Sequence, residues 1–152
     1  MNLLDSLTIA SANQQHRIEL YHGDLSDMPP EQAVDVLVVS AYPGVYTPSR
    51  TSVMGALYKK GISVEALSLK KAVDLTQAFS SWMSRDIPAG IPGVQFKRIL
   101  CFEPSVRRNV AEVIGDVFQG LMPFVYASPP NYIDCHVSRD NRRPGGSDGR
   151  SP

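Results

Sequence analysis

The run from Val34 to Ala41 constrains the fold of this chain more than any other segment. It reads Val-Asp-Val-Leu-Val-Val-Ser-Ala, so it is nearly continuously apolar and rich in β-branched side chains. Such a run suits a central strand that is buried on both faces, and a strand of this kind usually belongs to a parallel sheet covered by helices. The segment therefore predicts an α/β fold.

Two further strands are predicted, one before and one after this run. Residues 16–22 alternate between polar and apolar side chains, with Ile18 and Leu20 on the same face. This alternation predicts a half-buried strand that ends at the Gly23-Asp24 turn. The apolar run at residues 96–102 predicts a second buried strand.

Serines and a glycine mark the ends of two predicted helices. Ser52 is placed to cap a helix over residues 53–60, and Gly61 suits the left-handed position that ends it. Ser63 is placed to cap a second, shorter helix.

The strongest helical pattern follows Pro104-Ser105. Apolar side chains recur there every three or four residues, at Val106, Val110, Val113, Val117 and Leu121. Pro123 is expected to end or kink this helix. Residues 72–87 are ambiguous, because their apolar spacing fits a helix while Phe79–Met83 also fits a strand.

Composition limits the classes of function. The chain has 152 residues, 43% of them hydrophobic, and a formal net charge of zero. These values suit one domain and predict no strong attraction to nucleic acid or to a membrane surface. No apolar run approaches the roughly 20 residues that span a bilayer. Two cysteines, Cys101 and Cys135, are too few for a disulfide framework, which favours a cytoplasmic or nuclear location.

The chain divides into three parts by pattern. Residues 1–15 are expected to be a lead-in, and residues 16–127 carry the periodic segments of an α/β domain. Residues 128–152 are almost wholly polar at their end, and we expect them to be a disordered tail.

The segment from Ile18 to about Leu69 resembles the start of a macro domain, the ADP-ribose-binding α/β module. The matching pieces are the Ile-Glu-Leu-Tyr-His-Gly-Asp-Leu strand and turn, the Val-Asp-Val-Leu-Val-Val-Ser-Ala strand, and the segment from Ser52 to Gly61. The resemblance implies a three-layer α/β/α sandwich with a mixed sheet. Because the chain runs from its long helix into the polar tail, we expect the family's last strand and helix to be missing.

The sequence also departs from the family pattern. Ser40-Ala41-Tyr42-Pro43 stands where the family usually has an Asn-Ala-Ala-Asn-like signature, so the asparagine associated with hydrolysis has no match. The glycine-rich loop before the helix is replaced by residues 47–52, which read Thr-Pro-Ser-Arg-Thr-Ser. No catalytic residue is therefore assigned.

The resemblance places the ligand between the first turn and the first helix. It implies that Asp24 accepts a hydrogen bond from the adenine amino group, with the Leu25 amide nearby. The alternative is that Asp24 only supports the turn, where aspartate is common. The rest of the candidate site is Ser40, Ala41, Tyr42, Arg50, Thr51, Ser52 and Val53.

The start of the helix at Val53 indicates a ligand site by an argument that depends less on the family resemblance. A helix N-terminus offers free amides and partial positive charge to an anion, and Arg50, Thr51 and Ser52 could add contacts to a diphosphate. The alternative is an ordinary cap beside an exposed arginine.

Other groups carry less weight. Arg107 and Arg108 could serve an anionic partner or be simply solvated. The histidines and Cys135-His136 show no metal spacing, so neither a metal nor a cofactor is predicted. Trp82 is expected in the core.

Three functions remain open at this point. The first is a non-catalytic macro-like module that binds ADP-ribose, a related nucleotide or an ADP-ribosylated protein. The second is a degenerate interaction or regulatory domain that binds a protein partner. The third is an ADP-ribosyl hydrolase, for which no general base is evident after Ser40. Membrane and nucleic-acid partners are not expected.

Overall fold

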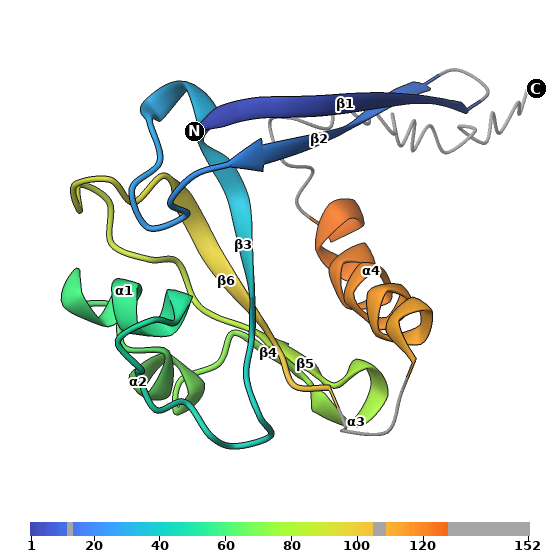
Figure 1. Cartoon of the computed structure of the whole chain (residues 1–152). Helices are drawn as coiled ribbons and strands as arrows, with labels where there is room; N and C mark the ends of the chain where they lie inside the picture. The colour runs from blue at the N-terminus through green and yellow to red at the C-terminus, as the bar shows by residue number, and fades with distance from the viewer. Residues whose placement is uncertain (12–13, 105–108, 128–152) are drawn as a thin grey trace, which may run out of the picture.

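The computed structural model describes residues 1–11, 14–104 and 109–127, which form an α/β fold with a mixed sheet and several helices (Figure 1). The predicted α/β class is confirmed. The elements in chain order are β1 (Asn2–Ser11), β2 (Gln14–His22), a 3-10 turn (Pro30–Gln32), β3 (Val34–Ser40), α1 (Val53–Lys59), α2 (Val64–Ser68), β4 (Val73–Leu75), α3 (Thr76–Phe79), β5 (Ser81–Met83), β6 (Phe96–Phe102) and α4 (Val110–Ala127). The predictions for residues 128–152 and for Arg107 and Arg108 lie outside the described residues.

The main sheet has four strands in the order β3-β6-β5-β4. β3 and β6 are parallel, whereas β5 is antiparallel to both of its neighbours, β6 and β4. The two apolar runs that predicted buried strands correspond to β3 and β6. The carboxyl ends of this parallel pair therefore lie at the same edge of the sheet.

The prediction that the Val34–Ala41 run is a central strand buried on both faces is wrong. β3 stands at the end of the strand order, so one of its edges has no neighbour in the described sheet. Leu37 and Val39 are buried, but Val34 and Val38 on the opposite face are 41% and 38% exposed. The reason is topological, because β2 pairs with β1 and not with β3.

Helices lie on both faces of the sheet (Figure 1). On one face, Trp82 and Cys101 belong to a core cluster that also contains Leu57 of α1 and Val64 of α2. On the other face α4 packs on β5, and Gly120 lies close to this strand, since an added Cβ there would lie 2.7 Å from Ser81 Oγ.

β1 and β2 pair as an antiparallel hairpin with a bulge between Leu3 and Asp5. β1 fills most of residues 1–15, the segment that the sequence pattern predicted as a lead-in. The prediction of a half-buried strand at residues 16–22 is also wrong in its burial. Ile18 and Leu20 are 54% and 59% exposed, since none of the described elements makes extensive contact with β1 or β2 apart from the contact of the two strands with each other.

The local helix signals hold. The Ser52 hydroxyl accepts a hydrogen bond from the Gly55 amide at the start of α1, and the Ser63 hydroxyl accepts one from the Ala66 amide at the start of α2. Gly61 has a φ of +83°, the left-handed conformation expected after α1.

The ambiguous residues 72–87 are divided among short elements. Ser80 takes a left-handed conformation (φ 49°), which ends α3 after four residues and starts β5. Trp82 and Met83 are then fully buried in β5. The strand alternative is therefore correct for Ser81–Met83, whereas Phe79 belongs to α3, and Trp82 is a core residue as expected.

The long helix predicted after Pro104-Ser105 corresponds to α4, and the predicted first turn at residues 105–108 lies outside the described residues. Within the described residues α4 begins at Val110, with the Asn109 side chain accepting from the Glu112 amide. Pro123 lies inside α4 and does not end it, because the helix continues to Ala127. No helix of the described residues has the length and apolar character that crossing a bilayer requires.

Candidate functional site

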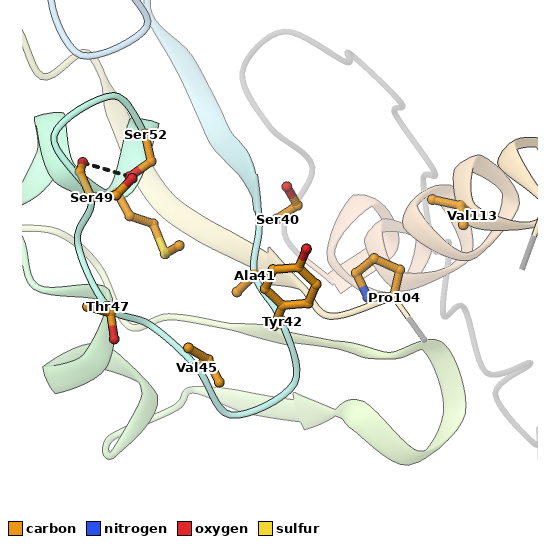
Figure 2. A pocket seen from close by; sticks show the side chains of 10 residues that line it. Ser40, Ala41, Tyr42, Val45, Thr47, Ser49, Ser52, Pro104 and Val113 are labelled. Atoms are coloured by element: carbon orange, nitrogen blue, oxygen red, sulfur yellow. Dashed lines mark hydrogen bonds between the residues drawn. The ribbon is translucent and has the colours of Figure 1, made fainter. Parts of the chain in front are cut away.

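A pocket of about 650 Å³ opens at the carboxyl end of β3, between the loop of residues 42–52 and α4 (Figure 2). This volume falls in the range usual for small-molecule sites. The pocket is lined by Ser40, Ala41, Tyr42, Val45, Thr47, Ser49, Ser52, Met54, Pro104 and Val113.

The lining combines apolar groups with hydroxyl groups. The hydroxyls come from Ser40, Tyr42, Thr47, Ser49 and Ser52, and the lining residues of the described chain include no charged side chain. The Ser52 hydroxyl is already engaged, because it donates to the Ser49 carbonyl and accepts from the Gly55 amide. Such a lining suits the neutral, hydroxyl-bearing part of a ligand better than a phosphate.

Gly55 fixes the loop against the first turn of α1. A Cβ at Gly55 would collide with the backbone carbonyl of Ser49, so only glycine permits this approach. The same carbonyl accepts the Ser52 hydroxyl, as the dashed line in Figure 2 shows. The wall of the pocket at Ser49 and Ser52 therefore depends on the absence of a side chain at Gly55, in the first turn of α1.

A buried carboxylate anchors the middle of the same loop. Glu103 follows β6 and is only 9% exposed. Its Oε1 accepts hydrogen bonds from the Tyr46 hydroxyl at 2.5 Å and from the Trp82 indole N–H at 2.8 Å. The Tyr46 ring also packs edge-on against Trp82, at 5.8 Å between ring centroids. Burial, with the Glu103 contact adding to it, raises the pKa of Tyr46 to about 12.

The structure places Asp24 and Leu25 away from this pocket. The turn that contains Asp24 lies beside the start of β6, because the Met28 amide donates to the carbonyl of Gly93. Lys60, at the C-terminal end of α1, donates from Nζ to Asp27 and to the Pro92 carbonyl in the same region. The pocket, in contrast, lies where α1 begins. The Gly-Asp turn therefore lies beside the amino end of β6, whereas the pocket lies at the carboxyl end of β3.

The Asp24 carboxylate is engaged within its own turn. Its Oδ1 accepts from the amide of Ser26 at 2.8 Å and from the Ser26 hydroxyl at 2.7 Å. These hydrogen bonds lower the pKa of Asp24 below its usual value. The geometry is that of an aspartate which stabilises a turn, the second role considered from the sequence.

The nine candidate residues are thus only partly brought together. Four of them line the pocket: Ser40, Ala41, Tyr42 and Ser52. The other three residues near the start of α1 are exposed but do not line the pocket: Arg50, Thr51 and Val53. Arg50 therefore stands near the rim, where it could reach only a ligand that extends out of the pocket.

The sequence analysis missed Glu103 and Tyr46. An acidic residue directly after a buried apolar strand was an available signal, because such a carboxylate needs hydrogen-bond donors. Nothing local in the sequence indicates that the donors are Tyr46 and Trp82.

Neither a metal site nor a reactive thiol is evident in the part of the chain that is described. No group of three or more histidine, cysteine, aspartate or glutamate side chains there could hold a metal ion. Cys101 is buried, and burial raises the pKa of its thiol to about 12. Such a thiol is a poor nucleophile.

Comparison of the chain with models of known families, with curated proteins and with solved structures finds no match.

Proposed function

We propose that this chain is a non-catalytic, macro-like α/β module that binds a nucleotide such as ADP-ribose. The pocket at the carboxyl end of β3 is the binding site, and it takes the uncharged nucleoside or ribose part of the ligand. The diphosphate lies at the rim, on the side of Arg50. The partner is either the free nucleotide or a protein that carries it.

The observation that supports this proposal most directly is the position of the pocket. Ligands of open α/β sheets bind outside the carboxyl ends of parallel strands, and this pocket lies at the carboxyl ends of β3 and β6. The hydroxyl groups of Ser40, Thr47 and Ser49 match sugar hydroxyls, and the exposed ring of Tyr42 can cover one face of a base. The described lining residues offer no carboxylate, imidazole or thiol, which favours binding over turnover.

A second candidate, a protein-interaction domain without nucleotide binding, is favoured by a different observation. Large apolar side chains are exposed on the β1–β2 hairpin and on α4. Exposed apolar surface of this extent marks protein contacts more often than ligand sites.

Calorimetric titration with ADP-ribose, AMP and adenosine tests the proposal. We expect ADP-ribose to bind the intact chain in the micromolar range. Thr47→Trp fills the pocket and should weaken ADP-ribose binding by about tenfold or more. Gln77→Trp is the matched control, because Gln77 is exposed on α3 and does not line the pocket. Circular dichroism of each variant establishes that it is folded.

Two more variants locate the parts of the ligand. Arg50→Ala should weaken binding of ADP-ribose but not of adenosine, since only the former carries a diphosphate. Asp24→Ala should leave the affinity unchanged, because Asp24 lies at the other end of β3. A folded chain that gives no heat with any of the three ligands would contradict the proposal and support the interaction domain. Release of ADP-ribose from a modified peptide would instead establish a hydrolase.

A further inference from the structure

The β1–β2 hairpin projects from the body of the molecule as an arm (Figure 1). Among the described residues its strands pair only with each other, and no other element makes extensive contact with either strand. The arm is tied down at its base, where Met1 packs against the core and its carbonyl accepts from the Gln32 side chain. An isolated two-stranded hairpin is marginally stable in water, so an arm of this length requires further contacts that bury one of its faces.

The two faces of the arm differ sharply. The pairing register places Leu7 opposite Ile18, and it places Thr8 opposite Arg17 on the other face. The side chains that share the first face include four large apolar residues, all of them between 44% and 59% exposed: Leu7, Ile9, Ile18 and Leu20. The second face is polar along its middle, where it carries an ion pair between Arg17 and Glu19, and its larger apolar groups, Leu3 and Tyr21, stand only at the base end. The continuous apolar surface therefore lies on the first face, which gains most by leaving water.

The carboxylate and the imidazole at the two ends of the apolar face indicate its partner, because an imidazole N–H can donate to a carboxylate. Asp5 lies at the base end, opposite Leu20, and His16 lies at the tip end, opposite Ile9. A second arm that is stacked in the reverse direction brings the base end of each face onto the tip end of the other. Asp5 of each copy then lies at the end that holds His16 of its partner, whereas stacking in the same direction would gather like groups.

We propose that two copies of this chain associate by stacking the apolar faces of their β1–β2 arms in opposite directions. The arrangement has a two-fold axis near the Leu7–Ile18 pair, so both copies use the same surface. Two stacked hairpins make a small two-layer sandwich, in which each face covers the other at about 10 Å. The formal net charge of the chain is zero, so no overall repulsion opposes the association.

The oligomeric state of the full chain tests this proposal. Sedimentation velocity should detect a dimer whose population rises with protein concentration. The double variant Leu7→Ser with Ile18→Ser should raise the dimer dissociation constant by about tenfold or more. The control, Thr8→Ser with Arg17→Ser, changes the neighbouring cross-strand pair on the polar face and should leave the constant within about twofold.

A charge exchange tests the direction of stacking without removing apolar surface. Asp5→Lys should weaken the dimer, and the addition of His16→Asp should restore it. A chain that stays monomeric at every concentration would overturn the proposal. Equal loss in the Leu7/Ile18 and Thr8/Arg17 variants would overturn it as well. A dimer that survives Leu7→Ser with Ile18→Ser but is lost in Phe118→Ser would place the interface on α4 instead.

Discussion

At the scale of single residues, the Glu103 carboxylate connects the core of the sheet to the loop that shapes the pocket. Its two donors come from separate elements, Tyr46 in the loop and Trp82 in β5. Each donor satisfies part of a buried charge that would otherwise be costly to remove from water. A change in any of the three residues is therefore expected to act on the position of the loop as well as on stability.

The raised pKa of Tyr46 predicts a loss of stability in alkali. In the folded chain this pKa is about 12, whereas the ordinary value is 10.0. The hydroxyl therefore contributes its full stability below about pH 10 and loses it as the pH rises towards 12, because the unfolded chain releases the proton first. Cys101, with a thiol pKa of about 12 against an ordinary 9.0, adds a loss of the same sign over an overlapping range.

Urea unfolding of the chain at pH 8 and pH 11 measures this effect. Tyr46→Phe should lower the free energy of unfolding at pH 8 by about 1 kcal/mol, through the lost hydrogen bond to Glu103. The same variant should lose less stability than the unaltered chain between the two pH values. Tyr58→Phe is the control, since Tyr58 is 58% exposed. A Tyr46→Phe variant that loses as much stability between pH 8 and pH 11 as the unaltered chain would contradict the assignment.

At this scale, a contact could be predicted from the sequence only where its two partners lie close together along the chain. The caps at Ser52 and Ser63 and the left-handed Gly61 were predicted correctly, because each acts within three residues of its own position. The partners of Glu103 lie 57 and 21 residues away from it. The position of Glu103 after an apolar strand was a signal in the sequence, but no local pattern encodes such pairs, so its two donors could not be found there.

At the scale of elements, the sequence predicted where the strands of the main sheet lie in the chain better than it predicted which strands pair with each other. The apolar runs identified β3 and β6, but the burial predicted for β3 assumed a partner on each side. In the described part of the chain the outer edge of β3 has no neighbouring strand, because β2 folds back on β1. Apolar character alone does not say which strand pairs with which, and the edge position of β3 is therefore a property of the whole topology.

Two glycines in helices predict opposite effects of the same substitution. Gly55→Ala in α1 should destabilise the chain by roughly 1–3 kcal/mol, because its Cβ would collide with the Ser49 carbonyl. Gly115→Ala in α4 should stabilise it by up to about 1 kcal/mol, since a Cβ there meets nothing in the described chain within 4 Å and alanine favours the helix.

Denaturant unfolding of the two glycine variants measures both effects. Binding of ADP-ribose should also weaken in Gly55→Ala if the pocket is the site, because the loop must move. Stabilisation by both alanines would show that the Ser49 carbonyl does not lie against Gly55 of α1 in solution.

At the scale of the whole molecule, the chain consists of a body with a packed core and an arm without one. The body places helices on both faces of the main sheet, and Ile99, Leu100 and Cys101 of β6 are fully buried within it. The two strands of the arm are paired along their length, with one bulge between Leu3 and Asp5. No apolar side chain of β1 or β2 is among the buried residues of the described chain. Stability is therefore expected to differ strongly between the two parts of the molecule.

Hydrogen exchange measured by mass spectrometry makes this difference visible. In dilute solution the amides of β1 and β2 should exchange much faster than those of β6, because the arm can open without breaking the core. If the arms stack in pairs, exchange in β1 and β2 should slow as the protein concentration rises, while exchange in β6 stays constant. The Leu7→Ser, Ile18→Ser variant should lose this dependence on concentration. Slow exchange in the arm at the lowest concentration would show instead that the hairpin is covered by its own chain, and the division into body and arm would then be wrong.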